Sequence, residues 1–268
     1  MTRTEITPDQ IKEHYDSLAF IYRTFWGDHI HHGLFRDSES PAEAQLKMLS
    51  HCAEILGLRG GEEVLDVGCG HGGTLIYLAH AFGCRGTGLT ISPKQARIAN
   101  EHVSRAHLGE TLSFLIGDAD SFSFPANDFD LVWVMESSEH FFDKSRFFRN
   151  VARTLRPGGK LLLAAWTGSM DNPKVAEVAR IFLCPELWTA EQYESAIESA
   201  GMRLTCCEDL SANVIRTWEV CRERVAMAKP VLKLMPRAVQ EFAAGMELIL
   251  EAYRTGDLTY SVMSAVAS

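Results

Sequence analysis

Val64-Leu65-Asp66-Val67-Gly68-Cys69-Gly70-His71-Gly72-Gly73 is the stretch that decides the fold. Its first four residues are mostly apolar and predict a buried β-strand, which leads directly into four glycines among six residues. Residues 74–82 follow with apolar side chains at three- and four-residue spacing, which indicates a helix. A strand, a turn without side chains and a helix together let the backbone approach a nucleoside-bearing ligand closely.

The spacing of the glycines leaves the ligand open. Gly68-x-Gly70-x-x-Gly73 fits the dinucleotide fingerprint, but Asp66-x-Gly68-x-Gly70-x-Gly72 is an equally good interpretation. A nicotinamide-binding unit usually carries an acid about 20 residues after the first glycine. Gly88-Leu89-Thr90 stand there instead, and no Tyr/Lys or His arrangement for hydride transfer is evident. The sequence therefore disfavours a nicotinamide oxidoreductase.

Composition and charge narrow the class of protein. The 268 residues are 46% hydrophobic, which permits a sizeable core in one α/β domain with accessory helices. The net charge of −9 argues against nucleic acid or an anionic membrane as a partner. Residues 1–11 lack the apolar core of a signal peptide, and no apolar run is long enough for stable membrane insertion. Seven cysteines without a C-x-x-C motif predict reduced thiols and a cytoplasmic location.

Strands and helices alternate at the βαβ rhythm from residue 62 onward. Continuous apolar runs at 131–135 and 161–165 predict strands buried on both faces. Residues 203–207 and 259–266 have strand character and predict an antiparallel pair at one edge. The expected strands are 63–68, 85–91, 112–117, 130–135 and 160–166, with helices at 73–83, 93–107 and 143–155.

Capping signals mark where further helices begin. Thr7-Pro8-Asp9-Gln10 and Ser40-Pro41-Ala42-Glu43 have capping-box form and predict helices over 8–24 and 41–57. Ser92-Pro93-Lys94-Gln95 and Thr189-Ala190-Glu191-Gln192 repeat the pattern, whereas Arg156-Pro157-Gly158-Gly159 predicts a helix stop and a turn before the fifth strand. Residues 214–255 are predicted to be helical and are unusually apolar, which indicates either a lid or the interface of a homodimer.

These patterns together predict the α/β class: a Rossmann-like, doubly wound, mostly parallel seven-stranded sheet with an antiparallel edge strand, N-terminal helices and a helical lid insertion.

Five motifs follow one another along the chain, at residues 64–73, 88–95, 117–119, 129–132 and 155–161. With these motifs the chain resembles the S-adenosylmethionine-dependent methyltransferases of the doubly wound kind, from about residue 10 to the C-terminus. Three further motifs are Trp26-Gly27-x-His29-x-His31-His32-Gly33, Met135-Glu136-Ser137-x-Glu139-His140 and Tyr253-Arg254-x-Gly256. They carry a closer resemblance, to the tocopherol O-methyltransferase branch near sterol and cyclopropane-forming C-methyltransferases.

The resemblance implies one methyltransferase domain over residues 1–268. Residues 1–60 would form an N-terminal helical lid, and 61–213 the core that binds S-adenosylmethionine. Residues 214–255 would be a helical insertion over the substrate pocket, and 256–268 the last edge strand.

The resemblance also implies which residues hold the cofactor. Gly68 and Gly70 would let its methionine part and ribose approach the backbone, and Asp66 would orient the loop and the cofactor's amino group. No acid ends the second strand, so Leu89, Thr90 and Gln95 would serve the ribose side, although Gln95 also suits the N3 place of its capping box. Asp118 and Ala119 would flank the adenine, unless Asp118 merely caps a turn. Tyr15, Tyr22 and Trp26 would close over the sulfonium, or else only pack their helix.

Catalytic candidates are the polar residues expected near the acceptor: His140, Glu136 and His32. A neutral histidine can assist deprotonation of a phenol, and carboxyl ends of parallel strands face the ligand crevice. This favours His140 and Glu136, with Glu136 also a candidate cofactor contact. Pocket-wall roles remain the alternative. The cluster His29-Ile30-His31-His32 lacks the partner spacing of a metal site, so no metal is predicted.

The predicted function is methyl transfer to an apolar small molecule, with a phenolic or prenylated oxygen acceptor favoured. A carbon acceptor such as an isoprenoid is the main alternative, because sterol and cyclopropane-forming relatives share the pair Glu139-His140. A nitrogen acceptor and a non-methylating enzyme that uses the same cofactor fold also remain open. The acidic charge and the lack of a basic aromatic stripe disfavour nucleic-acid or protein methylation.

Overall fold

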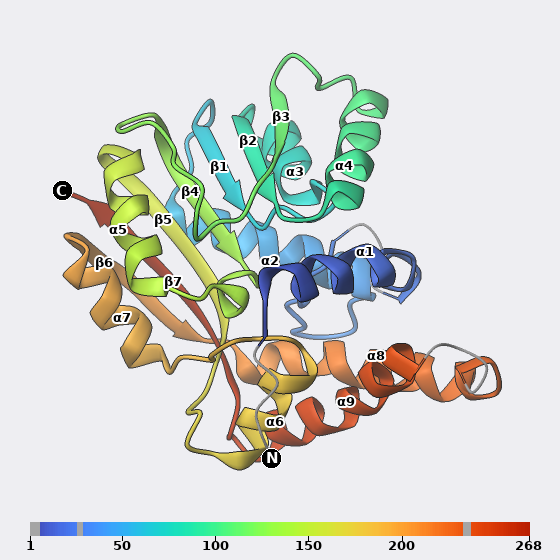
Figure 1. The fold of residues 1–268 in the computed structure, drawn as a ribbon. Coiled ribbons are helices and arrows are strands. Elements are labelled where there is room, and N and C mark those ends of the chain that lie inside the picture. The colour runs from blue at the N-terminus through green and yellow to red at the C-terminus, as the bar shows by residue number, and fades with distance from the viewer. Residues whose placement is uncertain (1–5, 26–28, 233–236) are drawn as a thin grey trace.

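The computed structural model describes residues 6–25, 29–232 and 237–268, and within them every side chain except those of 18–25, 228–232, 237–238 and 242. A seven-stranded sheet runs through the centre in the order β3-β2-β1-β4-β5-β7-β6 (Figure 1). Its strands are β1 (Glu63–Val67), β2 (Arg85–Thr90), β3 (Leu112–Ile116), β4 (Phe129–Met135), β5 (Leu155–Thr167), β6 (Met202–Asp209) and β7 (Thr259–Ala267).

Strands β1 to β5 pair in parallel, and β7 runs antiparallel to both β5 and β6. The predicted doubly wound sheet with an antiparallel element is therefore confirmed. The prediction that residues 256–268 form the edge strand is wrong, because β7 lies one place inside and β6 is the edge. Burial gives the reason: β7 is buried along almost its whole length, whereas buried and exposed residues alternate along β6.

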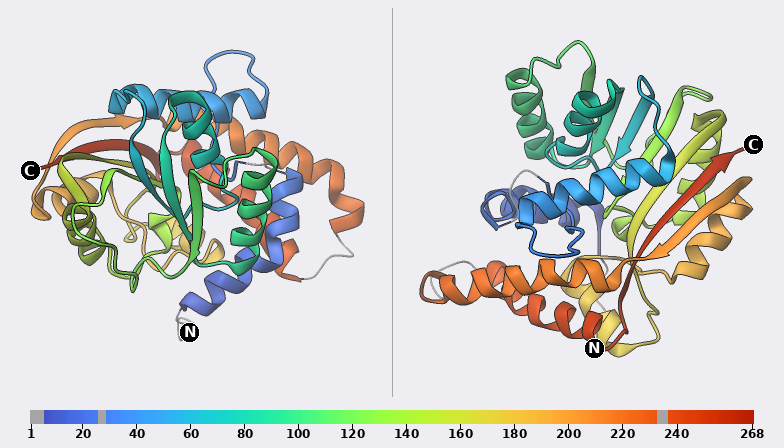
Figure 2. Two further views of the ribbon diagram at one scale, coloured as in Figure 1. Left: turned by 90° about the horizontal axis from the view of Figure 1, so that it is seen from above. Right: turned by 180° about the vertical axis from the view of Figure 1, so that it is seen from behind.

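Helices cover both faces of the sheet (Figures 1 and 2). One face packs against α2 (Pro41–Leu56) and α3 (Gly73–Phe82), with Leu131 and Trp133 of β4 pointing to that side. The other packs against α5 (Lys144–Thr154) and α7 (Ala190–Ser199), with Val132 and Val134 turned toward it. Successive side chains of β4 point to opposite faces of the sheet, so its continuous apolar run contributes to both cores.

Four further helices lie near the carboxyl ends of the parallel strands: α1 (Pro8–Phe25), α6 (Pro173–Ile181), α8 (Ser211–Leu232) and α9 (Arg237–Arg254). Figure 1 shows α1 passing across these ends and the hairpin of α8 and α9 below. The remaining helix, α4 (Pro93–Arg105), packs along the sheet beside β2 and β3. Many apolar residues of the segment 214–255 pack in the hydrophobic core, including Trp218, Met246 and Ile249. No helix in the described ranges is long and apolar enough to cross a membrane.

Two local predictions change in the structure. Leu155 already pairs with Phe129, and the register then jumps to Lys160 opposite Leu131, so the Arg156–Gly159 turn is an irregularity inside β5 rather than a segment before it. The capping box expected at Ser92 is half formed: Ser92 accepts from the Gln95 backbone, but the Gln95 side chain bonds Thr90 instead. The boxes at Thr7, Ser40 and Thr189 are confirmed.

Candidate active site

A cavity with about 980 Å³ of space free of protein atoms opens at the carboxyl ends of β1, β2 and β4. Strands in an open α/β sheet present ligand sites at this edge. The side chains of Tyr22 and Trp26 lie outside the described part of the structure. Every other predicted cofactor residue lines this cavity: Tyr15, Asp66, Gly68, Gly70, Leu89, Thr90, Gln95, Asp118, Ala119 and Glu136.

The glycine loop after β1 combines two different requirements for glycine. Gly68 has φ +82°, and a Cβ there would lie 2.2 Å from Ser137 Cβ, so this position is needed for packing. Ser137 in turn donates to the carbonyl of Val67 at 2.7 Å. Gly70 has φ +52°, and the nearest atom to an added Cβ would be Ile30 Cδ1 at 3.9 Å. A side chain at Gly70 would therefore fill the cavity rather than collide with the protein.

Asp66 supplies a buried acid beneath this loop. Its side chain is 2% exposed, and Oδ2 has no hydrogen-bond partner among the described residues. Burial raises the pKa of Asp66 to about 7. A buried carboxyl of this kind fits an ammonium ligand, since a positive charge would stabilise its ionised form.

Polar groups at the ends of β2 and β3 line the same cavity. Thr90 Oγ1 donates to Gln95 Oε1 at 2.7 Å, which turns the Gln95 side chain toward β2. Asp118 Oδ1 accepts from the Asp120 amide at 3.0 Å and so caps its turn as well as lining the cavity. In a nicotinamide enzyme an acid at this place binds the ribose. In this protein the uncharged pair Thr90 and Gln95 stands there instead.

His140 lies on the wall that the main cavity shares with a smaller chamber. A carbonyl can only accept, so Nδ1 of His140 donates to Leu183 O at 3.0 Å, and Nε2 accepts from Tyr15 Oη at 2.7 Å. Leu183 holds that carbonyl with a left-handed φ of +55°, which is rare for leucine. Burial lowers the pKa of His140 to about 4. The ring is therefore neutral, with its lone pair directed at Tyr15.

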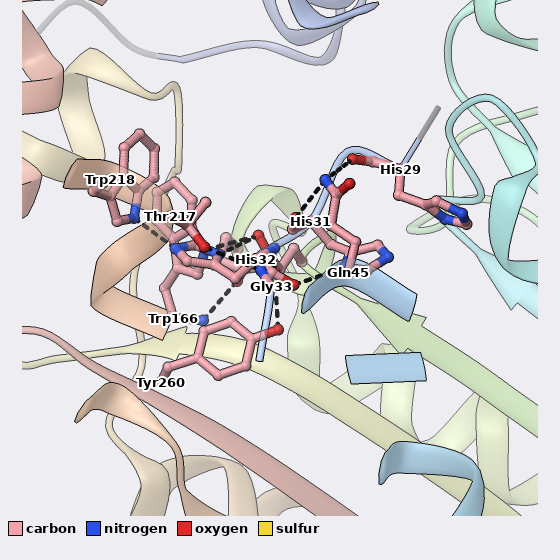
Figure 3. A network of polar contacts seen from close by, with 11 residues as sticks. His29, His31, His32, Gly33, Gln45, Trp166, Thr217, Trp218 and Tyr260 are labelled. Atoms are coloured by element: carbon pink, nitrogen blue, oxygen red, sulfur yellow. Dashed lines mark hydrogen bonds and ion pairs between the residues drawn. The ribbon is translucent and has the colours of Figure 1, made fainter. Parts of the chain in front are cut away.

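Glu136 and His32 form the centre of a buried network. Figure 3 shows His32 with Trp166, Trp218 and Tyr260 around it. Glu136 Oε1 accepts from the His32 amide at 2.6 Å and from Tyr260 Oη at 2.9 Å. Its Oε2 contacts His32 Nδ1 at 2.7 Å and Trp166 Nε1 at 3.3 Å. Burial alone would raise the pKa of Glu136, but the contacts with His32 and the attraction of His31 hold it below its usual value. The network ties the loop around residue 32 to β4, β5 and β7.

This network argues against two of the predicted roles. His32 Nε2 accepts from Trp218 Nε1 at 2.5 Å, and an indole N–H is a donor only, so it cannot pass a proton on to the ring. Because Nδ1 faces Glu136, neither nitrogen of His32 is available as a base. Both oxygens of Glu136 are likewise engaged, which favours a positioning role over contact with the cofactor or the substrate. Glu136 also has a left-handed φ of +50°, a strain that its four hydrogen bonds can offset.

The smaller chamber lies beside the main cavity and has about 500 Å³ of free space. Sequence reasoning missed most of its aromatic wall, although Trp166 near the end of β5 could have signalled it. From residues 214–255, only Trp218 is among the described lining side chains. The chamber is lined by Tyr15, Ile30, His32, Glu136, Glu139, His140, Trp166, Phe182, Cys184 and Trp218.

The glycine cradle, the buried acid beneath it and the uncharged pair at the end of β2 fit a sulfonium nucleoside better than a nicotinamide. The class of protein that this fold and site define is the S-adenosylmethionine-dependent methyltransferases. The chain belongs to the family described as mycolic acid cyclopropane synthetase, whose model matches residues 2–257.

Curated relatives carry methyltransferase names. The chain is 29% identical over 289 residues to a chloroplastic tocopherol O-methyltransferase of Arabidopsis thaliana, a match that covers 98% of this chain and 83% of the relative. It is 33% identical over 229 residues to the 27-O-demethylrifamycin SV methyltransferase of Amycolatopsis mediterranei, which covers 82% and 84%.

Solved structures share the whole fold. A cyclopropane synthase of Mycobacterium tuberculosis superposes with a TM-score of 0.87 at 21% identity, covering 98% of this chain and 99% of that one. A [4+2]-cyclase superposes with a TM-score of 0.85 at 25% identity, covering 97% of both chains. The fold alone thus hosts more than one chemistry.

Proposed function

We propose that this methyltransferase alkylates an oxygen of an apolar, ring-bearing small molecule that occupies the smaller chamber. The observation that carries the proposal is His140, a neutral histidine on the wall between the two cavities, hydrogen-bonded to Tyr15. A phenolic acceptor needs a group that removes its proton, and this hydrogen-bonded pair supports that role.

When bound, S-adenosylmethionine supplies a methyl group that is activated by the positive charge on sulfur. Gly68 and Gly70 would leave room for it, and Asp66 would neutralise its amino group. The acceptor hydroxyl would donate to Tyr15 Oη, which donates to His140 Nε2. The proton would move along this chain as the bond from oxygen to the methyl group forms and the bond from sulfur to the methyl group breaks, with S-adenosylhomocysteine as the leaving group. The low basicity of His140 suffices, because an oxygen that is gaining a methyl group becomes a strong acid. Positioning supplies much of the rest of the acceleration.

The relatives' names support an oxygen acceptor, since one is called tocopherol O-methyltransferase and another 27-O-demethylrifamycin SV methyltransferase. The aromatic wall of the chamber favours a second candidate, methylation of a carbon in an isoprenoid. Trp166, Phe182 and Trp218 could stabilise a carbocation through their ring faces. A proton would then leave carbon rather than oxygen.

Incubation with methyl-labelled cofactor distinguishes these candidates. The purified chain should transfer label to members of a panel of alkylated phenols, and mass spectrometry of the products should place it on oxygen. Label on carbon in a prenyl chain would favour the second candidate. A changed product without label would indicate a cyclase-like reaction and would contradict methyl transfer.

We further infer a reducing, cytoplasmic setting. All seven cysteines are free, and five are buried. Free thiols are the rule where glutathione keeps cysteines reduced.

The affinity for S-adenosylhomocysteine should fall between pH 7 and pH 5.5. Burial raises the pKa of Asp66 to about 7, so below this pH the carboxyl must lose a proton before it can neutralise the ligand's ammonium. The loss should approach about tenfold per pH unit. Calorimetry at several pH values would measure it, and Asp66→Asn should bind more weakly at pH 7 with little pH dependence. An equal dependence in Asp66→Asn would mean that another group titrates.

A further inference from the structure

We propose that Glu139 forms a second recognition point inside the smaller chamber, where its carboxyl group donates a hydrogen bond to a carbonyl or ether oxygen of the acceptor molecule. This oxygen is distinct from the atom that is methylated. The inference rests on the proposed function only in taking this chamber as the place where the acceptor binds.

The Glu139 side chain is held on one side and unpartnered on the other. It belongs to the single turn η1 (Ser138–His140) after β4 and is 2% exposed. Oε1 accepts from the backbone N–H of Trp166 at 2.7 Å, which anchors the carboxyl against β5. Oε2 is fully buried and has no hydrogen-bond partner among the described residues. A buried polar atom without a hydrogen-bond partner destabilises the folded protein, and a ligand that bonds to this atom can offset the cost.

The other polar side chains of the chamber have hydrogen-bond partners within the protein. Tyr15 bonds His140, and the ring of His32 lies between Glu136 and Trp218. Trp166 Nε1 donates to Glu136, and Cys184 contacts the carbonyl of Phe182. Glu139 Oε2 is thus the buried polar atom of this wall that has no hydrogen-bond partner among the described residues. The rest of the wall offers aromatic and aliphatic surface.

The protonation state of Glu139 selects the kind of ligand atom. Burial raises its pKa to about 8, with a further rise from the nearby Glu136, against which the hydrogen bond from the Trp166 N–H acts. The acid is therefore mostly protonated at neutral pH and can donate from Oε2. Oxygens without a proton, in a ketone, ester or ether, suit such a donor. Titratable groups that interact with this carboxyl are Glu136, Lys144, Cys184, Tyr193 and Tyr253.

A pair of probes of nearly equal shape tests the proposal without any methyl transfer. Acetophenone carries a carbonyl oxygen where α-methylstyrene carries a methylene group, and neither compound titrates. Ligand-observed NMR should show acetophenone binding about tenfold more tightly than α-methylstyrene to the unaltered protein at pH 7. Glu139→Gln keeps a donor and should keep the preference, whereas Glu139→Leu should bind both compounds alike.

A pH series covers the case in which Glu139→Leu does not fold. The preference for acetophenone should decline above pH 8 in the unaltered protein, because an ionised carboxylate repels a carbonyl oxygen, and should stay constant in Glu139→Gln. A preference that survives in Glu139→Leu, equal binding of both probes to the unaltered protein, or no binding of either would overturn the assignment. Because no cofactor is used, a failed methylation assay leaves this result intact, and the reverse also holds.

Discussion

Gly70→Asn should bind S-adenosylhomocysteine at least about 100-fold more weakly than the unaltered protein while keeping its fold. Gly70 has φ +52°, a conformation that asparagine tolerates better than other side chains. The space around an added Cβ is open except for Ile30 Cδ1 at 3.9 Å, so the new amide would extend into the cavity. It would then occupy room that the cofactor needs. Calorimetry measures the affinity, and thermal melting measures the stability.

Gly57→Asn is the matched control for this variant. Gly57 has nearly the same backbone, with φ +57°, and no atom within 4 Å of an added Cβ, but it ends α2 and does not line the cavity. Both variants carry the same backbone strain, so they should lose similar stability, and only Gly70→Asn should lose affinity. Equal affinity in the two would place the cofactor somewhere other than the glycine loop.

His140→Ala should reduce kcat for O-methylation by about 10²- to 10⁴-fold and leave the affinity for the cofactor within about threefold. Without the imidazole, the Tyr15 hydroxyl loses its acceptor at 2.7 Å, and the proton of the substrate has no base to reach. Tyr15→Phe keeps the aromatic ring and removes only the hydroxyl, so it should also lower kcat. Because the two side chains act in one chain, the double variant should be little worse than the more severe single variant.

His80→Ala controls for the loss of a histidine, since His80 is an exposed residue in the last turn of α3. It should be as active as the unaltered protein. Steady-state kinetics of each variant, with cofactor affinity measured separately, separates catalysis from binding. Unchanged kcat in His140→Ala would show that this residue is only part of the wall, and additive losses in the double variant would argue against a shared proton path.

The cofactor wall could be predicted from the sequence to a large extent. Asp66 and Thr90 lie in the last two residues of a strand, and Gly68 and Asp118 follow one closely. The carboxyl ends of parallel strands meet at one edge of the sheet, where all four line the cavity. Short-range signals such as the glycine loop and the capping boxes reflect the chain's local conformational preferences, so they could be identified without any tertiary contact. Such local signals do not give the position of β7 in the sheet, because that position depends on which strands lie on either side of it.

The acceptor side was decided by tertiary structure. His32 and Trp218 are 186 positions apart, and their contact removes His32 from the list of available bases. The carbonyl of Leu183, 43 positions from His140, sets the tautomer of the His140 ring. The backbone N–H of Trp166 bonds to only one of the two carboxyl oxygens of Glu139. Sequence by itself determined the strand–glycine–helix unit, because backbone conformation and hydrophobic period are local properties, and the resemblance of its motifs to one enzyme family indicated the class of cofactor. Which polar atoms remain free to act on a substrate was decided only by packing, because each hydrogen bond there joins segments that are distant in the chain.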